Sequence, residues 1–158
     1  MSTIFKEFPT ITDYSGFELT DFSKRISITK TIKNSPSLYQ EYSIQGYESA
    51  EELAQDFYED PGLYWLIYSM NDIIDPFFGW ILTQSQLEAF TADKYTDVNG
   101  LHHYELNGDV VSSTTPNAIP ITNLNHEDSI NEKKRKIKIL RPSFVKNIKR
   151  AIQSTVNE

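Results

Sequence analysis

The chain has 158 residues, enough for one domain of ordinary size or for a small core with attached arms. It has no cysteine, which excludes disulfides, thiolate catalysis and Cys-ligated zinc, and its three histidines leave little for a metal site. No apolar run reaches the ~18–20 residues of a membrane span, and the first residues lack the apolar region of a secretory signal. We therefore expect a soluble protein made in a cytoplasm.

The net charge of −7 is unevenly distributed along the chain. Residues 1–33 carry +1, residues 34–126 carry −13 and residues 127–158 carry +5. Such a separation of charge bears on association and on the choice of partner rather than on the fold.

Residues 1–37 are polar with spaced aromatic side chains, and no helical or strand period is sustained along them. Disordered segments usually lack aromatic residues. We therefore expect an extended arm that lays its aromatics, Phe17 and Phe22 among them, on another surface. A disordered tail is the alternative.

A compact region begins after the arm with a strand and a capped helix. Local alternation of apolar and polar residues predicts a strand near 39–45. Ser49 and Glu52 have the spacing of a capping box, and apolar residues at helical spacing follow them.

Two further helix starts follow. Asp60 is suited to be an N-cap, with Pro61 in the first turn, and the helix they open is apolar almost all round. Such a helix must be covered on most sides, by its own domain or by a partner. Thr83 and Gln86 predict another capping box that opens a helix to about Tyr95.

Residues 96–130 differ in kind and are expected to be an insertion that holds a hairpin. Asn107-Gly108 is a strong two-residue hairpin turn, which pairs Tyr104 with Val111 if the turn is type I′. The Ser/Thr/Pro-rich stretch that follows has the composition of a loop.

His102 and His103 lie in the first strand of this predicted hairpin. As adjacent strand residues they are expected to point to opposite faces, so that they cannot ligate one metal ion. We expect exposed hairpin histidines, and no metal or cofactor.

A short strand and an amphipathic helix end the chain. Ile137 and Ile139 alternate with lysines, which predicts a half-exposed strand near 136–141 that pairs antiparallel with the strand near 39–45. The last helix carries an apolar stripe of Phe144, Val145, Ile148, Ala151, Ile152 and Val156. This stripe either packs on its own domain or docks on a partner.

Residues 133–150 contain nine basic residues and no acidic one. Such a cluster suits nucleic acid, but the chain as a whole is acidic, and several of these residues form the polar face of the last helix. We therefore expect no nucleic acid; an acidic protein partner and a plain solvated face both remain open.

The order strand, capped helix, Asp-Pro turn, buried helix and late strand is a βααβ layout that resembles the LysM domain. A more specific pattern lies in residues 48–80 and 131–142. It reads E-E-L-A…Y-x-D-P-x-L-Y-W, then N-D…D-P…G-W, and closes with E-K-K-R-K-I-K-I. The positions in the first block are Glu51, Glu52, Leu53, Ala54, Tyr58, Asp60, Pro61, Leu63, Tyr64, Trp65, Asn71, Asp72, Asp75, Pro76, Gly79 and Trp80. This pattern resembles the LysM-like baseplate wedge subunit of contractile-tailed, T-even-type bacteriophages.

The resemblance implies an α+β fold with a small LysM-like βααβ domain over residues 38–142. The insertion 96–130 interrupts this domain, the extended N-terminal arm 1–37 precedes it, and the C-terminal amphipathic helix 143–158 follows it. In LysM domains, loops that flank the two helices form a shallow groove for N-acetylglucosamine polymers. Here those loops hold the bulky Tyr47 and the segment 72–78, which is longer and more apolar than a sugar-binding groove needs. We therefore expect that this domain no longer binds glycan.

The resemblance also implies a structural protein of the virion tail baseplate, made in the host cytoplasm and monomeric until assembled. It would join neighbouring wedge subunits around the tail hub, including wedge-core and sheath-initiator-type subunits, without membrane or nucleic acid. The partner-interface candidates are Phe17, Phe22, Trp65, Tyr68, Asp72, Asp75, Phe77, Phe78, Trp80, Arg141, Phe144, Ile148, Lys149 and Ile152. Core packing is the alternative for Trp65 and Trp80.

Two other function classes compete with this one. A LysM module that binds peptidoglycan is the alternative, although it needs neither the arm nor the last helix. For a hydrolase, Asp72 and Asp75 have the spacing of a carboxylate pair, but turn and capping duty explains both. Because no phosphate-binding loop and no nucleophile elbow is present, we expect no enzyme and no catalytic residue.

Overall fold

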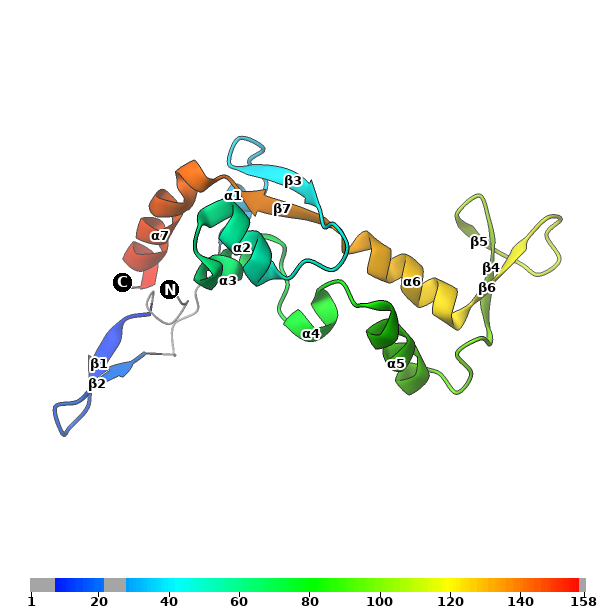
Figure 1. Ribbon diagram of the computed structural model, residues 1–158, viewed down its shortest axis with the longest axis horizontal. Helices are drawn as coiled ribbons and strands as arrows, with labels where there is room; N and C mark the ends of the chain where they lie inside the picture. The colour runs from blue at the N-terminus through cyan, green and yellow to red at the C-terminus, as the bar shows by residue number, and fades with distance from the viewer. Residues whose placement is uncertain (1–7, 22–27, 157–158) are drawn as a thin grey trace. The chain divides into compact units, whose positions relative to one another are not determined.

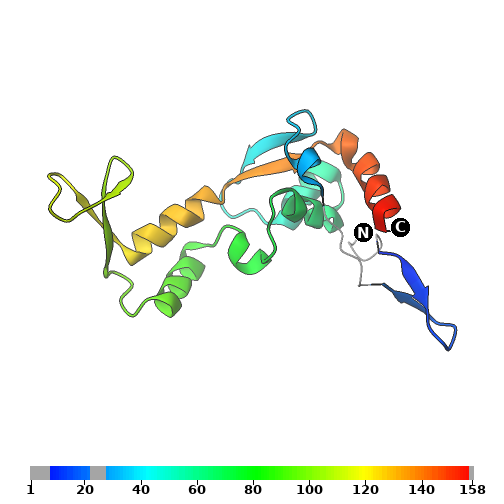
Figure 2. The same cartoon turned by 180° about the vertical axis from the view of Figure 1, so that it is seen from behind.

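The computed structural model describes residues 8–21 and 28–156, with side chains as far as residue 150 (Figures 1 and 2). The fold is mixed α+β, as predicted, and it divides into two compact units. Unit 1 combines Met1–Pro76 with Lys136–Glu158, and unit 2 is Phe77–Arg135. Within the described ranges, no helix is both long and apolar enough to span a membrane.

The centre of unit 1 is a two-stranded sheet with two helices packed against it. Strand β3 (Tyr39–Ser43) pairs antiparallel with β7 (Lys136–Leu140), which confirms the predicted pairing. Between them in the chain come α2 (Ala50–Tyr58), the 3₁₀ turn η2 (Pro61–Leu63) and α3 (Tyr64–Met70). Helix α2 packs on α3, α3 contacts β7, and both helices lie on one face of the strand pair (Figures 1 and 2).

Helix α2 and the turn η2 begin where the sequence places them. Ser49 and Glu52 form a complete capping box at the start of α2. The side chain of Asp60 accepts a hydrogen bond from the backbone N–H of Gly62 at 3.0 Å, which opens η2. The apolar side chains that these elements bury include Leu53, Ala54, Trp65, Leu66, Ile67, Met70, Ile137, Ile139 and Leu140.

The N-terminal segment contains regular structure that the sequence did not predict. Strand β1 (Thr10–Thr12) pairs antiparallel with β2 (Glu18–Thr20), and a short helix α1 (Lys30–Lys33) follows. The turn is local in origin: Asp13 Oδ1 accepts from the backbone N–H of Ser15 at 2.8 Å and of Phe17 at 2.9 Å. Three-residue strands are too short to leave a clear alternating pattern.

Helix α7 (Pro142–Val156) completes unit 1, and it starts one residue before the predicted helix 143–158. Two residues of its apolar stripe, Val145 and Ile148, are buried. Phe144, the third described residue of the stripe, is half-buried, so the chain itself covers much of this part of the stripe.

In unit 2, β4 (Leu101–Leu106) lies between β5 (Asp109–Val111) and β6 (Ile119–Thr122). The predicted hairpin is confirmed, because Tyr104 lies opposite Val111 and both turn residues have positive φ, 55° at Asn107 and 92° at Gly108. Those signs are what a type I′ turn requires.

Unit 2 contains two elements beyond the predicted hairpin, and one of them overlaps the stretch that was expected to be a loop. The end of the Ser/Thr/Pro-rich stretch forms β6, where Pro120 is tolerated because β6 pairs with β4 alone. Helix α6 (Asn123–Lys133) follows it, and Thr122 caps this helix by accepting from the backbone N–H of Asn125. The helix is polar, so it carries no apolar stripe in the sequence.

The prediction that His102 and His103 point to opposite faces is also wrong. The pairing of β4 with β6 slips between Leu101 and His103, so that two residues of β4 oppose one of β6. Such a bulge turns consecutive side chains toward the same side. The Nδ1 atoms of the two rings are 2.6 Å apart.

Helices α5 (Gln84–Lys94) and α6 pack together, and polar side chains form hydrogen bonds between them. Thr83 and Gln86 form the predicted capping box of α5. The buried carboxylate of Glu127 accepts from Lys94 Nζ at 2.7 Å and from the Tyr95 hydroxyl at 2.8 Å. Burial alone would raise the pKa of Glu127, but these two hydrogen bonds outweigh it and hold that pKa below its ordinary value.

Candidate interaction surfaces

Three of the predicted interface residues are buried within the chain. Trp65 is 3% exposed, Trp80 is 8% exposed and Ile148 is 6% exposed. Side chains this deep contribute to the core, which is the alternative stated for the two tryptophans. Phe22 and the side chain of Ile152 lie outside the described residues.

Other predicted residues are at the surface. Phe17 is 68% exposed, Phe77 is 82% exposed and Phe78 is 54% exposed. Apolar side chains of this size gain from leaving water, about 1.5–3 kcal/mol each when fully buried, so they are candidates for contact with a partner.

The hairpin β1–β2 presents an apolar surface that sequence reasoning missed except for Phe17. Ile11 and Leu19 are cross-strand partners, so their side chains share one side of the hairpin, and both are about half exposed. We call Ile11, Phe17 and Leu19 the hairpin patch. An isolated two-stranded hairpin is marginally stable in water, so covering this patch would stabilise it.

In unit 2, the helix α4 (Pro76–Gly79) presents the second exposed aromatic group. The ring of Phe78 packs on Phe90, with 5.4 Å between ring centroids. Lys134 Nζ donates to the backbone oxygen of Phe78 at 2.8 Å, and burial lowers the pKa of Lys134. These contacts hold α4 against α5 and α6, while the Phe77 side chain remains exposed.

The two candidate carboxylates occupy the turn after α3. Asp72 has a left-handed backbone with φ 57°, and its carboxylate forms an ion pair with Lys33. Asp75 precedes Pro76 and is exposed. This arrangement supports the turn duty expected of both residues.

Tyr68 on α3 lies within reach of the negative charge of Glu51 on α2. Burial first, and then the charge of Glu51 and the neighbouring Tyr64, raise the pKa of Tyr68 to about 12. The two rings make an edge-to-face contact with 5.7 Å between centroids. Tyr68 therefore keeps its proton at any pH the protein meets in a cell.

Several basic residues near the end of the chain have partners within it. Arg141 Nε donates to the backbone oxygen of Tyr39 at 3.1 Å. Lys138 Nζ donates to the backbone oxygen of Lys33 and lies 4.7 Å from the centre of the Tyr39 ring. In α7, Phe144 and Lys149 are half-buried, whereas Lys146 and Arg150 are exposed.

An open groove lies beside α2, and sequence reasoning did not find it. Its lining includes carboxylates of α2 and of the loop before α2. The lining residues are Gln45, Tyr47, Glu48, Glu51, Glu52, Gln55, Asp56 and Pro61. The Glu48 carboxylate is already bound, because it accepts from the Tyr42 hydroxyl and from the backbone N–H of Gln45 at 2.7 Å.

Exposed apolar groups on small, well-capped units are typical of a protein that is built into a larger assembly. Residues 2–117 match the family described as Base plate wedge protein 53, and the chain belongs to that family. It is thus a structural protein of the phage tail baseplate rather than an enzyme, as the resemblance implied.

A curated relative supports this membership. Over 71 residues the chain is 38% identical to Baseplate wedge protein gp53 of Enterobacteria phage T4. The aligned part makes up 43% of this chain and 36% of that relative, so the chain matches about a third of the relative's length.

Proposed function

We propose that this chain joins neighbouring wedge subunits around the tail hub, with wedge-core and sheath-initiator-type subunits among its partners. The observation that carries the proposal is the hairpin patch, which lies within the residues that match the wedge family. The patch is apolar, exposed and held on a structure that is marginal alone, so burial by a neighbouring subunit would stabilise both the contact and the hairpin.

We also propose that the centre of unit 1 is LysM-like. The order β3, α2, α3, β7, the antiparallel pairing of the two strands and the helices on one face support this proposal. The groove beside α2 adjoins the loop where LysM domains read glycan. Its carboxylates and the internal bonds of Glu48 favour a domain that has kept the scaffold and lost the glycan site.

Co-expression with the other wedge proteins of the same phage tests the assembly role. The chain alone is expected to elute as a monomer in size-exclusion chromatography, and with its partners to elute in a complex. The triple variant Ile11→Ser, Phe17→Ser, Leu19→Ser should no longer elute with that complex. The matched control, Thr12→Ser with Glu18→Gln, changes the other side of the same hairpin and should remain in it.

If the triple variant, with an unchanged circular dichroism spectrum, still elutes with the wedge subunits, the hairpin patch is not the contact. If the parent chain joins no wedge subunit at all, the assembly role itself is wrong. Titration with chitin oligomers tests the LysM proposal separately, because micromolar binding in the groove would show a retained glycan site.

A further inference from the structure

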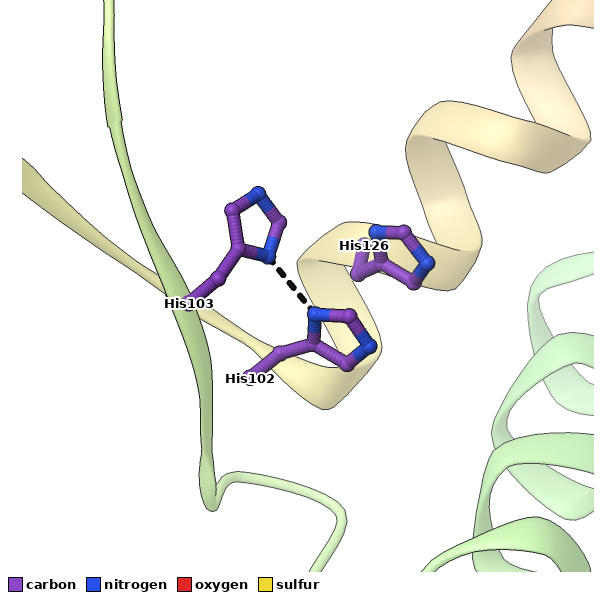
Figure 3. Close-up of side chains that lie close together, drawn as sticks. All are labelled: His102, His103 and His126. Carbon is purple, nitrogen blue, oxygen red and sulfur yellow. Dashed lines mark hydrogen bonds between the residues drawn. The ribbon is translucent and has the colours of Figure 1, made fainter. Parts of the chain in front are cut away.

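All three histidines of the chain come together in unit 2, between β4 and the first turn of α6 (Figure 3). The rings of His102 and His126 are stacked, with centroids 3.8 Å apart and planes 12° from parallel. His103 stands edge-on to His126, with 5.4 Å between centroids. One ring nitrogen from each residue lies within 4.8 Å of those of the other two.

The fold itself creates this meeting point. The bulge in β4 turns His102 and His103 to one side, and the cap at Thr122 starts α6 so that His126 faces them. Neither feature serves the packing of an apolar core, since His102 is exposed and neither His103 nor His126 is fully buried. Packing of the core therefore does not explain why three imidazoles lie together at this partly exposed place.

A carboxylate orients one of the rings. His103 Nε2 lies 2.9 Å from Glu105 Oε1, while its Nδ1 faces His102. A carboxylate bound to one ring nitrogen fixes the tautomer and leaves the other nitrogen as the ligand atom, as in the outer shell of many metal sites. The Nδ1 atoms of the two rings lie 2.6 Å apart, so they have to separate by less than about 1 Å to reach the spacing of two ligands of one metal ion.

We propose that His102, His103 and His126 bind one divalent transition-metal ion, of which Zn²⁺ fits the donor set best. Imidazole nitrogens suit Zn²⁺, whereas Ca²⁺ and Mg²⁺ prefer oxygen. At Zn–N distances of about 2.0–2.1 Å, tetrahedral ligands stand about 3.3 Å apart, so modest ring rotations within the present spacing form the site. Because His102 is exposed, the fourth ligand can be a water molecule.

Such an ion would fasten the sheet of unit 2 to its helix. β4 and α6 belong to segments separated by β5 and β6, and a metal clip closes the loop between them. A ligand that binds only the folded chain raises its stability in proportion to the logarithm of ligand concentration over Kd. The inference concerns the stability of unit 2 and does not depend on the role in wedge assembly.

Zinc titration of the full chain tests the proposal, with the affinity tag removed and bound metal stripped by a chelator. Isothermal titration calorimetry should show one Zn²⁺ per chain, and the three histidine Hε1 signals in proton NMR should shift together. His102→Ala, His103→Ala and His126→Ala should each weaken binding by at least about tenfold, and Glu105→Gln by about tenfold. Asn125→Ala, an exposed neighbour of His126, is the matched control and should bind like the parent.

Two results would overturn the site. One is the absence of Zn²⁺ binding by the parent chain. The other is unchanged affinity in a variant that lacks all three imidazoles, which would place the ion on surface carboxylates. Circular dichroism of each variant separates loss of the ligand from loss of the fold.

Discussion

The side-chain amide of Asn71 exchanges two hydrogen bonds with the backbone of Lys138, a residue 67 positions away. Nδ2 donates to the carbonyl oxygen of Lys138 at 2.8 Å, and Oδ1 accepts from its N–H at 2.7 Å. Nδ2 also donates to the carbonyl oxygen of Ile67 at 2.8 Å. One side chain thus fastens the end of α3 to β7, and it belongs to the motif by which the sequence resembles the wedge family.

Asn71→Ala should lower the free energy of unfolding by about 2–3 kcal/mol, because partly buried backbone groups of Lys138 lose their partners. Urea unfolding followed by tryptophan fluorescence measures this loss. Asn147→Ala changes an exposed asparagine of α7 and should cost almost nothing. Equal midpoints for the two variants would show that the amide adds no stability.

In unit 2, the side-chain amide of Asn131 makes the same pair of hydrogen bonds with the backbone of Leu82. It is buried, its Nδ2 donates to the carbonyl oxygen of Leu82 at 2.9 Å, and its Oδ1 accepts from the Leu82 N–H at 2.8 Å. Asn131→Ala should destabilise unit 2 by about 2–3 kcal/mol. Hydrogen exchange should show faster exchange at α5 and α6 and little change at β3 and β7; uniform change across both units would contradict this.

Ile148→Ala should lower the free energy of unfolding by about 2–5 kcal/mol, because it empties a buried position of α7. Thermal unfolding by circular dichroism measures the effect. Lys146→Ala, two residues earlier and exposed, is the control. A loss of wedge assembly by Ile148→Ala without loss of stability would instead indicate that the stripe contacts a partner.

Reversing the exposed charges of α7 should slow association with an acidic neighbour. Lys146→Glu with Arg150→Glu is expected to lower the association rate at low salt by roughly tenfold and to leave the fold intact. The difference should shrink at physiological salt, where screening acts beyond ~8 Å. Stopped-flow mixing with wedge partners measures the association rates. Equal rates for the parent and the variant at low salt would show that these side chains form only a solvated face.

Alkaline pH should destabilise unit 1, and Tyr68 is one of the partly buried tyrosines that contribute. The folded chain keeps this phenol protonated up to a pKa of about 12, whereas the unfolded chain releases the proton near pH 10. The folded state therefore binds more protons in that window, and the free energy of unfolding falls as the pH rises from about 10 to about 12. Tyr68→Phe should flatten this fall in urea titrations at fixed pH, and an unchanged slope would contradict the assignment.

Local signals were enough to predict much of this molecule. Capping boxes at Ser49 and Thr83, the Asn107-Gly108 turn and the alternation at Ile137 depend on neighbouring residues, so they can be read without the rest of the chain. The motif of residues 48–80 likewise led to the family and thereby to the phage baseplate.

Other features depend on contacts between residues far apart in sequence. Helix α6 is polar. It is held in position by hydrogen bonds between residues far apart in sequence, such as those of Glu127 with Lys94 and of Asn131 with Leu82. The burial of Trp65 and Ile148 follows from what packs over them, because an apolar pattern does not reveal whether its own chain or a partner covers it. The histidine cluster depends on a one-residue slip between β4 and β6, and since side chains alternate along a strand, only the register decides which of them meet.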